Sequence, residues 1–209
     1  MKNMLEIKLI KTHFRRETKL RIKPGMRALG IAECFLKNRK RSLLVGTIMR
    51  ADFQIDGFGF AFCTVGGLDA TDAVISLIKQ INRPDINIIL LSGTVIALFN
   101  IIDLNKVYLT IKKPLIAISY EPSEGIDKYL LQMPDGQKRI EILRKNGPRV
   151  KVILKNGLDV YIRPIGVDIS TSINVLNHFI ISGRYPEPIR VAKLLARSLY
   201  YFLLNSNLI

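Results

Sequence analysis

The sequence predicts an α/β protein whose mixed, five-stranded sheet is flanked by helices and followed by a C-terminal β-hairpin and two helices. The 209 residues are 48% apolar, which is enough to bury a core. Strand-like runs dominate the first third of the chain, and continuous apolar strands then alternate with helical segments. We expect a single domain over residues 1–209, with a basic lead-in at 1–24, the core sheet at 25–125, and the hairpin and helical extension at 126–209.

The core begins with three consecutive strands after the turn pair Pro24-Gly25. We place them at Arg27–Phe35, Leu43–Met49 and Phe53–Cys63. In the third strand, phenylalanines at positions 58, 60 and 62 share one face, and the other face carries Gly57, Gly59, Ala61 and Cys63. The small face should let a neighbouring element approach closely.

The next elements alternate between helix and strand. The residues Asp69-Ala70-Thr71-Asp72 open a helix that runs to about Ile81, with Asp69 at the N-cap and Asp72 as its return partner. We then expect a buried strand, a helix, and a second buried strand at Ile86–Leu91, Ile96–Thr110 and Pro114–Tyr120. Two hairpin connections followed by two crossovers give the order of a ribonuclease-H-like α/β fold.

The last third should contain a short charged helix at Gln137–Lys145, a β-hairpin and two helices. A three-residue loop, Lys155-Asn156-Gly157, aligns Leu154 with Leu158 and Val152 with Val160, so that the apolar faces match. Apolar stripes at helical spacing predict the final two helices.

The charge is strongly asymmetric along the chain. The 32 basic and 17 acidic residues leave a net charge of +15. Residues 1–50 hold fourteen basic and three acidic residues, which accounts for +11 of that total. This asymmetry indicates a polyanionic partner, and we expect nucleic acid, DNA more than RNA, rather than a membrane. A basic surface that only aids solubility is the alternative.

Several classes of protein are excluded by what the sequence contains. Two cysteines, Cys34 and Cys63, cannot build a disulfide scaffold or a zinc cluster. The longest uncharged run, Ile86–Ile102, is shorter than a membrane-spanning helix needs. We therefore expect a cytoplasmic protein. No nucleophile triad, phosphate loop or dinucleotide turn is visible in the sequence, although the turn at Gly66-Gly67 offers a weaker nucleotide-binding hypothesis.

Carboxylates are the remaining candidates for chemistry. In the predicted topology Glu33 lies on the first strand, Asp69 at the mouth of the first helix, and Asp103 beyond the fourth strand. Hard Mg²⁺ or Mn²⁺ ions prefer such oxygen ligands, and metal-assisted phosphodiester hydrolysis uses them. We predict these three acids as catalytic residues and metal ligands; the alternative for Asp69 is helix capping alone. The predicted nucleic-acid contacts are Arg27, Arg39, Lys40, Arg41, Arg190 and Lys193.

Several motifs in one order resemble the archaeal endonuclease dU family, which is related to endonuclease V. They are Arg27-Ala28-Leu29-Gly30-Ile31-Ala32-Glu33, Thr64-Val65-Gly66-Gly67-Leu68-Asp69-Ala70-Thr71, Gly93 through Asn100-Ile101-Ile102-Asp103, and Gly183-Arg184-Tyr185-Pro186-Glu187-Pro188-Ile189-Arg190-Val191-Ala192. The resemblance covers about Lys23 to Ser198. It implies a divalent-metal-dependent endonuclease that cuts DNA near deaminated bases such as deoxyuridine.

The sequence departs from endonuclease V where that family carries functional residues. Ala32, Ser92 and Val167 stand at three such places, and Tyr120 lies near the position of a family lysine. Asp69 is the acid that matches a family functional position. Two hypotheses follow: a metal-dependent endonuclease, and a non-catalytic nucleic-acid-binding relative that has lost part of the metal site.

Overall fold

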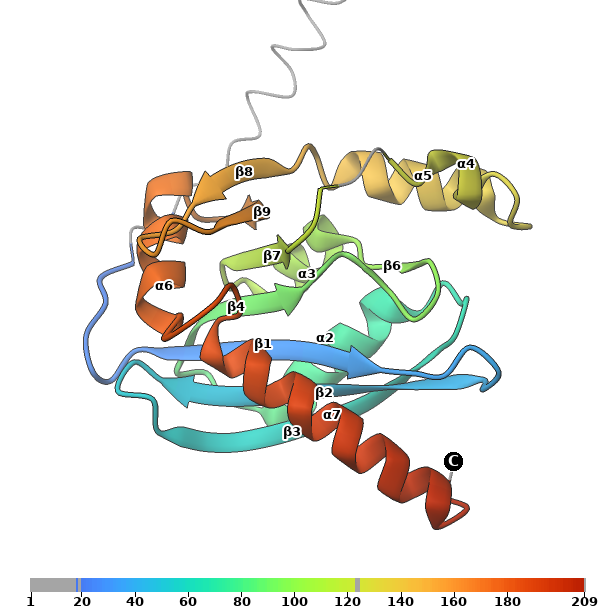
Figure 1. The fold of residues 1–209 in the computed structure, drawn as a ribbon, viewed down its shortest axis with the longest axis horizontal. Helices are drawn as coiled ribbons and strands as arrows, with labels where there is room; N and C mark the ends of the chain where they lie inside the picture. Colours follow the sequence, from blue (N-terminus) through green and yellow to red (C-terminus); the bar gives the residue numbers. More distant parts are fainter. Residues whose placement is uncertain (1–17, 19, 123–124, 209) are drawn as a thin grey trace, which may run out of the picture.

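The computed structural model describes residues 18, 20–122 and 125–208, so most of the predicted basic lead-in lies outside the described residues. One mixed sheet of seven strands forms the centre, in the spatial order β3-β2-β1-β4-β7-β9-β8 (Figure 1). Helices cover both faces of this sheet. The predicted α/β class is therefore right, whereas the predicted number of five strands is wrong.

The first three strands form the expected antiparallel meander: β1 (Arg27–Cys34), β2 (Arg41–Arg50) and β3 (Ile55–Thr64). Glycines on one face of this meander admit the helix α2 (Ala70–Ile81). A Cβ atom on Gly59 would lie 2.5 Å from Cγ1 of Ile81. The prediction that the small face of the third strand allows close approach is confirmed.

The middle of the sheet is parallel and buried. β4 (Ile86–Ser92) pairs in parallel with β1 on one side and with β7 (Leu115–Ser119) on the other. Ile88, Ile89, Leu90 and Leu91 are at most 1% exposed, because helices cover both faces of this strand. The continuous apolar pattern of the sequence predicted this position.

The C-terminal hairpin belongs to the sheet, which corrects the prediction of a separate extension. β9 (Asp159–Ile165) pairs antiparallel with β7, and β8 (Val150–Ile153) pairs with β9. Without β9, the buried strand β7 would present unpaired backbone groups along one edge. The predicted register is confirmed, since Val152 lies opposite Val160 and the Leu154 N–H donates to the Leu158 carbonyl at 2.8 Å.

The segment predicted as a helix at Ile96–Thr110 starts instead as a two-stranded hairpin. Its strands are β5 (Val95–Ile96) and β6 (Asn100–Ile101), and α3 (Leu104–Ile111) follows. Ala97, Leu98 and Phe99 at the tip of the hairpin all have positive φ angles, of 41°, 58° and 65°. Three successive left-handed residues are incompatible with a right-handed helix.

The helices form two layers on the sheet (Figure 1). α2 and α3 pack on one face, and α6 (Ile169–Phe179) and α7 (Glu187–Asn205) pack on the other. The short helices α4 (Asp127–Leu130) and α5 (Gly136–Lys145) pack against β6 through Ile140, Leu130 and Ile101. Within the described ranges we find no helix with the length and apolar character that crossing a membrane requires.

Candidate functional site

Two of the predicted catalytic carboxylates lie at one edge of the sheet. β1, β3, β4 and β7 all run toward this edge, and we call it the carboxyl edge. Glu33 lies near the end of β1, Asp69 follows β3, and Ser119 ends β7. In open α/β sheets, ligands bind outside the carboxyl ends of the parallel strands. The candidate site is therefore built from segments that are far apart in the sequence.

Asp69 does not cap its helix with its side chain, which corrects the predicted capping pair. Its carboxylate accepts hydrogen bonds from the Thr64 N–H at 3.1 Å, the Thr64 Oγ1 hydroxyl at 2.8 Å and the Asn100 amide at 2.7 Å. Burial alone raises the pKa of Asp69, but the hydrogen bonds from Asn100 and Thr64 outweigh it and lower the pKa below its usual value. The predicted return partner, Asp72, forms an ion pair with Lys106 at 2.6 Å instead.

Asn100 is the residue that positions Asp69, and the sequence did not reveal it. It is fully buried; its amide group donates to Asp69, and its Oδ1 accepts from the Ala70 N–H at 2.9 Å. Asn100 thus satisfies the first backbone donor of α2 in place of an ordinary cap. Asn100 stands in one of the motifs that carry the family resemblance, but its place inside an apolar run predicts a helix and gives it no role beside Asp69.

Glu33 lies in a less polar environment than Asp69. Its carboxylate accepts from Ser42 Oγ at 2.8 Å and from the Ala97 N–H at 3.4 Å. Burial raises the pKa of Glu33, and the hydrogen bonds from Ser42 and Ala97 and the charge of Lys193 only partly oppose that effect. The two carboxyls at this edge therefore have pKa values displaced in opposite directions, as in acid–base pairs.

Asp103 occupies the N-cap of α3, where its Oδ1 accepts from the Lys106 N–H at 2.9 Å. The predicted grouping of Glu33, Asp69 and Asp103 around one Mg²⁺ or Mn²⁺ ion is not formed. Across residues 18, 20–122 and 125–208, no group of three or more His, Cys, Asp or Glu side chains is placed to hold a metal ion. Each of the three carboxylates is instead engaged by nearby hydrogen-bond donors, so the residues present do not fit a ready-made metal site.

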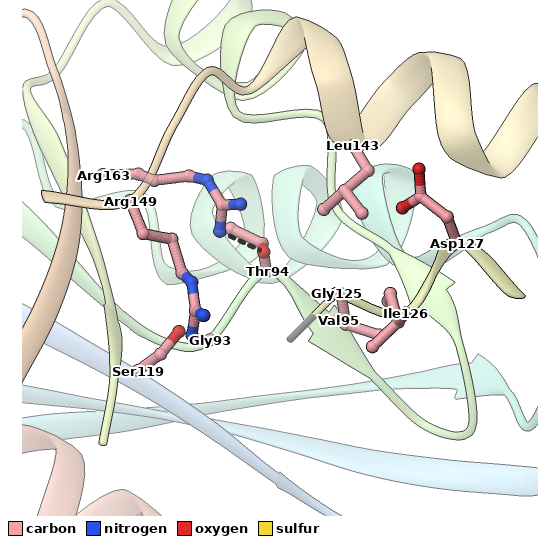
Figure 2. A pocket seen from close by; sticks show the side chains of 10 residues that line it. All are labelled: Gly93, Thr94, Val95, Ser119, Gly125, Ile126, Asp127, Leu143, Arg149 and Arg163. Carbon is pink, nitrogen blue, oxygen red and sulfur yellow. Dashed lines mark hydrogen bonds between the residues drawn. The ribbon is translucent and has the colours of Figure 1, made fainter. Parts of the chain in front are cut away.

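A pocket of about 510 Å³ opens beside the ends of β4 and β7 (Figure 2). Arg149 and Arg163 lie together on one side of it, and Asp127 lies opposite them. Arg163 donates to the Gly147 carbonyl at 2.8 Å and to Thr94 Oγ1 at 3.2 Å. Burial, and secondly the charge of Arg149, lower the pKa of Arg163. Two cations that face one pocket favour an anionic ligand there.

The sequence does not single out these two arginines, because nothing in it places the strand that carries Arg163 within the sheet. The pocket exists only because β9 pairs with β7, which sets Arg163 opposite Ala117 in the register. Arg149 lies just before β8, where it donates to the Glu121 carbonyl at 3.1 Å and lies 5.0 Å from the centre of the Tyr161 ring. Neither position carries a motif by which a sequence reading alone would find it.

The predicted nucleic-acid contacts divide into two groups. The turn between β1 and β2 places Arg39, Lys40 and Arg41, all exposed, at the carboxyl edge. Lys193 on α7 lowers the pKa of Glu33 and therefore lies on the same side. The structure thus brings four of the six predicted basic residues toward the candidate site.

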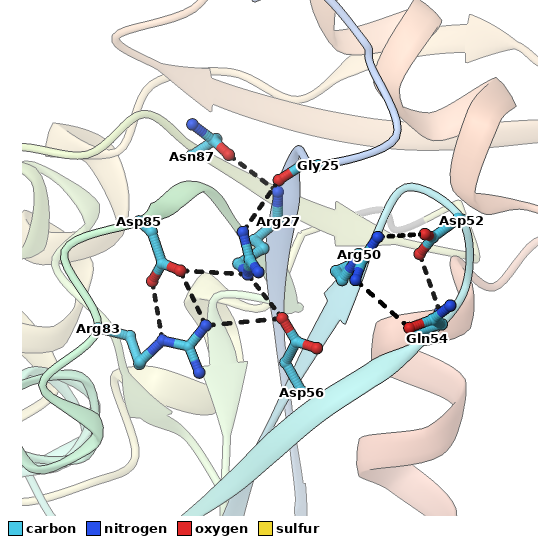
Figure 3. A network of polar contacts seen from close by, with 9 residues as sticks. All are labelled: Gly25, Arg27, Arg50, Asp52, Gln54, Asp56, Arg83, Asp85 and Asn87. Carbon is cyan, nitrogen blue, oxygen red and sulfur yellow. Dashed lines mark hydrogen bonds and ion pairs between the residues drawn. The ribbon is translucent and has the colours of Figure 1, made fainter.

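The other two basic residues are paired with acids. Arg27 lies at the opposite end of β1, where it contacts Asp56 at 2.6 Å and Asp85 at 3.2 Å (Figure 3). Arg190 binds Glu187 one turn earlier on α7, with Nε 2.8 Å from Oε2. These ion pairs reduce the positive charge that Arg27 and Arg190 could offer to a phosphate.

Sequence comparison places this chain among archaeal relatives. Residues 24–200 match the family described as endonuclease dU. A UPF0215 protein of Methanosarcina acetivorans is 33% identical over 184 residues, which cover 86% of this chain and 93% of that protein. A UPF0215 protein of Pyrobaculum aerophilum is 30% identical over 177 residues, which cover 84% of this chain and 95% of that protein.

Solved structures share the fold. A protein of unknown function from Archaeoglobus fulgidus superposes with a TM-score of 0.74 at 26% identity, covering 83% of this chain and 98% of that one. Endonuclease V from Streptomyces avermitilis gives a TM-score of 0.64 at 15% identity, covering 97% and 92%. Endonuclease V from Ciona intestinalis, solved with DNA containing an inosine, gives 0.57 at 12% identity, covering 97% and 100%. The fold is therefore similar to that of endonuclease V.

Proposed function

Because the chain belongs to the endonuclease dU family, we propose that it is a nuclease that hydrolyses DNA phosphodiester bonds near deaminated bases such as deoxyuridine. The observation that carries the proposal is the pair of arginines, Arg149 and Arg163, facing one pocket at the carboxyl edge. Guanidinium groups bind phosphate oxygens through paired hydrogen bonds. DNA bound to an endonuclease V of the same fold supports a nucleic acid as the ligand.

In this proposal, Glu33 and Asp69 supply the reacting carboxylates. The hydrogen bonds to Asp69 lower its pKa and favour its ionised form, whereas burial raises the pKa of Glu33 and favours its protonated form, so the two carboxyls suit different proton-transfer roles. Asp103 is the third predicted acid, and its Oδ1 is already used by the α3 backbone. Arg39, Lys40, Arg41 and Lys193 would hold the flanking phosphates.

Mg²⁺ or Mn²⁺ is the cofactor that the sequence predicts, but the described carboxylates do not form a site for it. The proposal therefore assigns no step to a metal ion. The same observation favours the second candidate function, a nucleic-acid-binding protein without hydrolytic activity. Both candidates use the arginine pocket, and they differ only in whether a bond is cut.

One cleavage assay separates these functions. Fluorescent single-stranded and duplex oligonucleotides containing one deoxyuridine, one inosine or neither are incubated with the protein in Mg²⁺, Mn²⁺ or EDTA, and an RNA of matched sequence is included. We expect a nick near the deaminated base, and the comparison of Mg²⁺, Mn²⁺ and EDTA shows whether the cut requires a metal ion. Asp69→Asn should reduce the cleavage rate at least 100-fold while DNA binding persists. Binding without cleavage under every condition would leave the non-catalytic function.

The role of the arginine pocket is tested by binding alone, in EDTA. Arg149→Gln and Arg163→Gln should each weaken DNA binding roughly tenfold and lower the slope of log K against log salt by about 0.9 per lost phosphate contact. Lys79→Gln, at an exposed position in the last turn of α2, is the charge-matched control and should change binding less than twofold. Equal losses in the control and the pocket variants would refute a phosphate site there.

A further inference from the structure

The outer strand β3 carries a row of aromatic side chains on the face that α7 shares with β1 and β2. Phe58 and Phe60 are 43% and 42% exposed, and Phe62 is partly buried beneath the guanidinium of Arg41, 3.8 Å from the ring centre. We call Phe58, Phe60 and Phe62 the phenylalanine row. α7 packs over β1 and β2, where Ile189, Ala192 and Ala196 are fully buried, and it leaves the first two rings of the row in contact with solvent.

The distance between neighbouring phenylalanines in the row matches the distance between two unpaired bases that hold one aromatic side chain between them. Alternate residues of a strand lie on one face, about 6.6 to 7 Å apart. Successive bases of one nucleic-acid strand stack about 3.4 Å apart, so a ring inserted between two bases separates them by about 7 Å. A regular duplex keeps its bases paired and stacked and cannot accept the rings in this way.

Positive charge adjoins one end of the row. The turn between β1 and β2 exposes Lys37, Arg39 and Lys40, and exposed Arg41 begins β2; we call these four residues the basic turn. A pocket of about 390 Å³ beside it is lined by Asn38, Arg39, Lys40, Arg41, Tyr200 and Leu204, none of which is acidic. The acid of β3, Asp56, lies beyond the far end of the row and is paired with Arg27 and Arg83 (Figure 3). This charge pattern complements a polyanion and opposes a basic or purely apolar partner.

The basic turn also connects the row to the candidate site. It follows β1, so it lies at the same edge as Glu33, and Arg41 stands opposite Thr64 at the end of β3. A strand that crosses the carboxyl edge reaches the basic turn first, then Phe62, Phe60 and Phe58 in that order. The surface therefore has a direction, with phosphate contacts near the candidate site and stacking contacts farther from it.

We propose that the phenylalanine row and the basic turn bind single-stranded nucleic acid, whose bases stack on Phe58 and Phe60 and whose phosphates contact Arg39, Lys40 and Arg41. This proposal does not depend on the nuclease function, because the surface would bind an unpaired strand whether or not the chain cuts it. Aromatic side chains stack on bases of any identity, so the surface should distinguish unpaired strands from duplexes rather than one sequence from another.

The test measures fluorescence anisotropy in EDTA with a labelled 15-nucleotide single strand and with the duplex of the same sequence. Phe58→Ala/Phe60→Ala should weaken single-strand binding at least tenfold and duplex binding less than twofold. Phe58→Tyr/Phe60→Tyr keeps the rings and should bind within twofold of the wild type. Ile153→Ala removes another exposed apolar side chain, on the opposite edge strand β8, and serves as the matched control.

The basic turn is tested separately. Arg39→Gln/Lys40→Gln should lower the salt slope for single strands by about 1.4, which is 0.7 for each phosphate contact. Equal losses for single strand and duplex in the alanine pair, or no loss in either, would overturn the proposal. So would a wild-type dimer in sedimentation velocity that the alanine pair converts to monomer, because β3 would then be covered by a second copy of the chain. If the wild type binds the single strand as expected but cuts none of the oligonucleotides, the result counts against the proposed nuclease function and not against the single-strand surface.

Discussion

Gly30 is a position where a single added methyl group should have a large effect. It lies in the middle of β1, under the first turn of α7, and its φ is compatible with any residue. A Cβ atom there would stand 2.3 Å from the carbonyl carbon of Pro188 and 2.5 Å from the nitrogen of Ile189. Both atoms belong to the helix backbone, so no side-chain rotation relieves the overlap.

The size of the effect follows from these distances. Carbon atoms pack favourably at about 3.5 to 4.0 Å, so β1 and the start of α7 must separate by about 1 Å. Overpacking in a dense core costs about 1 to 3 kcal/mol, and a rigid backbone neighbour places Gly30→Ala near 3 kcal/mol. For a chain of this length, that loss lowers the melting temperature by about 6 to 12 °C.

The measurement is thermal and urea unfolding of the wild type, Gly30→Ala and Gly25→Ala. A Cβ atom on Gly25 meets nothing within 4 Å, so Gly25→Ala should stay within about 0.5 kcal/mol of the wild type. A melting temperature within 3 °C of the wild type for Gly30→Ala would refute the reasoning. An equal loss in both variants would show that the overlap with α7 does not explain the effect, because the lower flexibility of the unfolded chain by itself stabilises a Gly→Ala variant.

Three further predictions concern the candidate site. Asn100→Ala should cost about 2 to 4 kcal/mol, measured by urea unfolding, because it leaves the buried Ala70 N–H without its acceptor and removes one of the donors to the Asp69 carboxylate. The pKa of Asp69 is lower in the folded than in the unfolded protein, so the ionised carboxylate stabilises the fold fully above its usual pKa and less as the pH falls. The unfolding free energies of the wild type and Asp69→Asn should therefore converge from about pH 5 downward. Parallel curves of unfolding free energy against pH would contradict this. Burial raises the pKa of Cys63 to about 12, so iodoacetamide at pH 8 should modify half-buried Cys34 slowly and Cys63 not at all, as mass spectrometry of the native protein can check.

Much of the fold was predictable because its signals are local. In the hairpin at 150–162, only one register places Val152 opposite Val160, and Gly157 supplies the left-handed residue, with φ of 80°, that the loop requires. The alternation of phenylalanine and small residues in β3 likewise fixed which face meets α2. In both cases the pattern of neighbouring residues determines the structure.

The pairing of β9 with β7 was not predictable in the same way. The hairpin is complete by itself, and nothing in its sequence states which edge it joins. That choice depends on the open edge of β7, which lies more than thirty residues earlier in the chain. The arginine pocket depends on the same pairing, since Arg163 reaches Thr94 only from β9, and it was therefore missed with it.

The contact between β1 and α7 is a second feature that a single sequence could not predict. The motifs around Gly30 and around Pro186-Glu187-Pro188 were both recognisable in the sequence. Their contact in space, with the α7 backbone lying against Gly30, explains why a glycine stands in a strand that is otherwise apolar. A single sequence shows each motif but not their juxtaposition.

The candidate site depends on a strained loop that the sequence presents as an ordinary apolar run. Each left-handed residue other than glycine costs about 1 to 2 kcal/mol, and Ala97, Leu98 and Phe99 are three in a row. Tertiary contacts must therefore hold this loop. The Gly66 N–H donates to the Ala97 carbonyl at 2.7 Å, and the buried Arg139 of α5 donates to the Phe99 carbonyl at 2.6 Å.

Arg139 also donates to the carbonyls of Gly66 and Gly67, both at 2.7 Å, and so fixes the turn that leads to Asp69 against the strained loop. The loop in turn brings the Ala97 N–H to Glu33 and, through β6, the Asn100 amide to Asp69. One buried guanidinium, from a helix outside the two main layers, thus sets the relative position of both carboxyls. Because it contacts backbone carbonyls rather than an acid, no charge pattern in the sequence reveals it, and the arrangement of the site follows from tertiary structure alone.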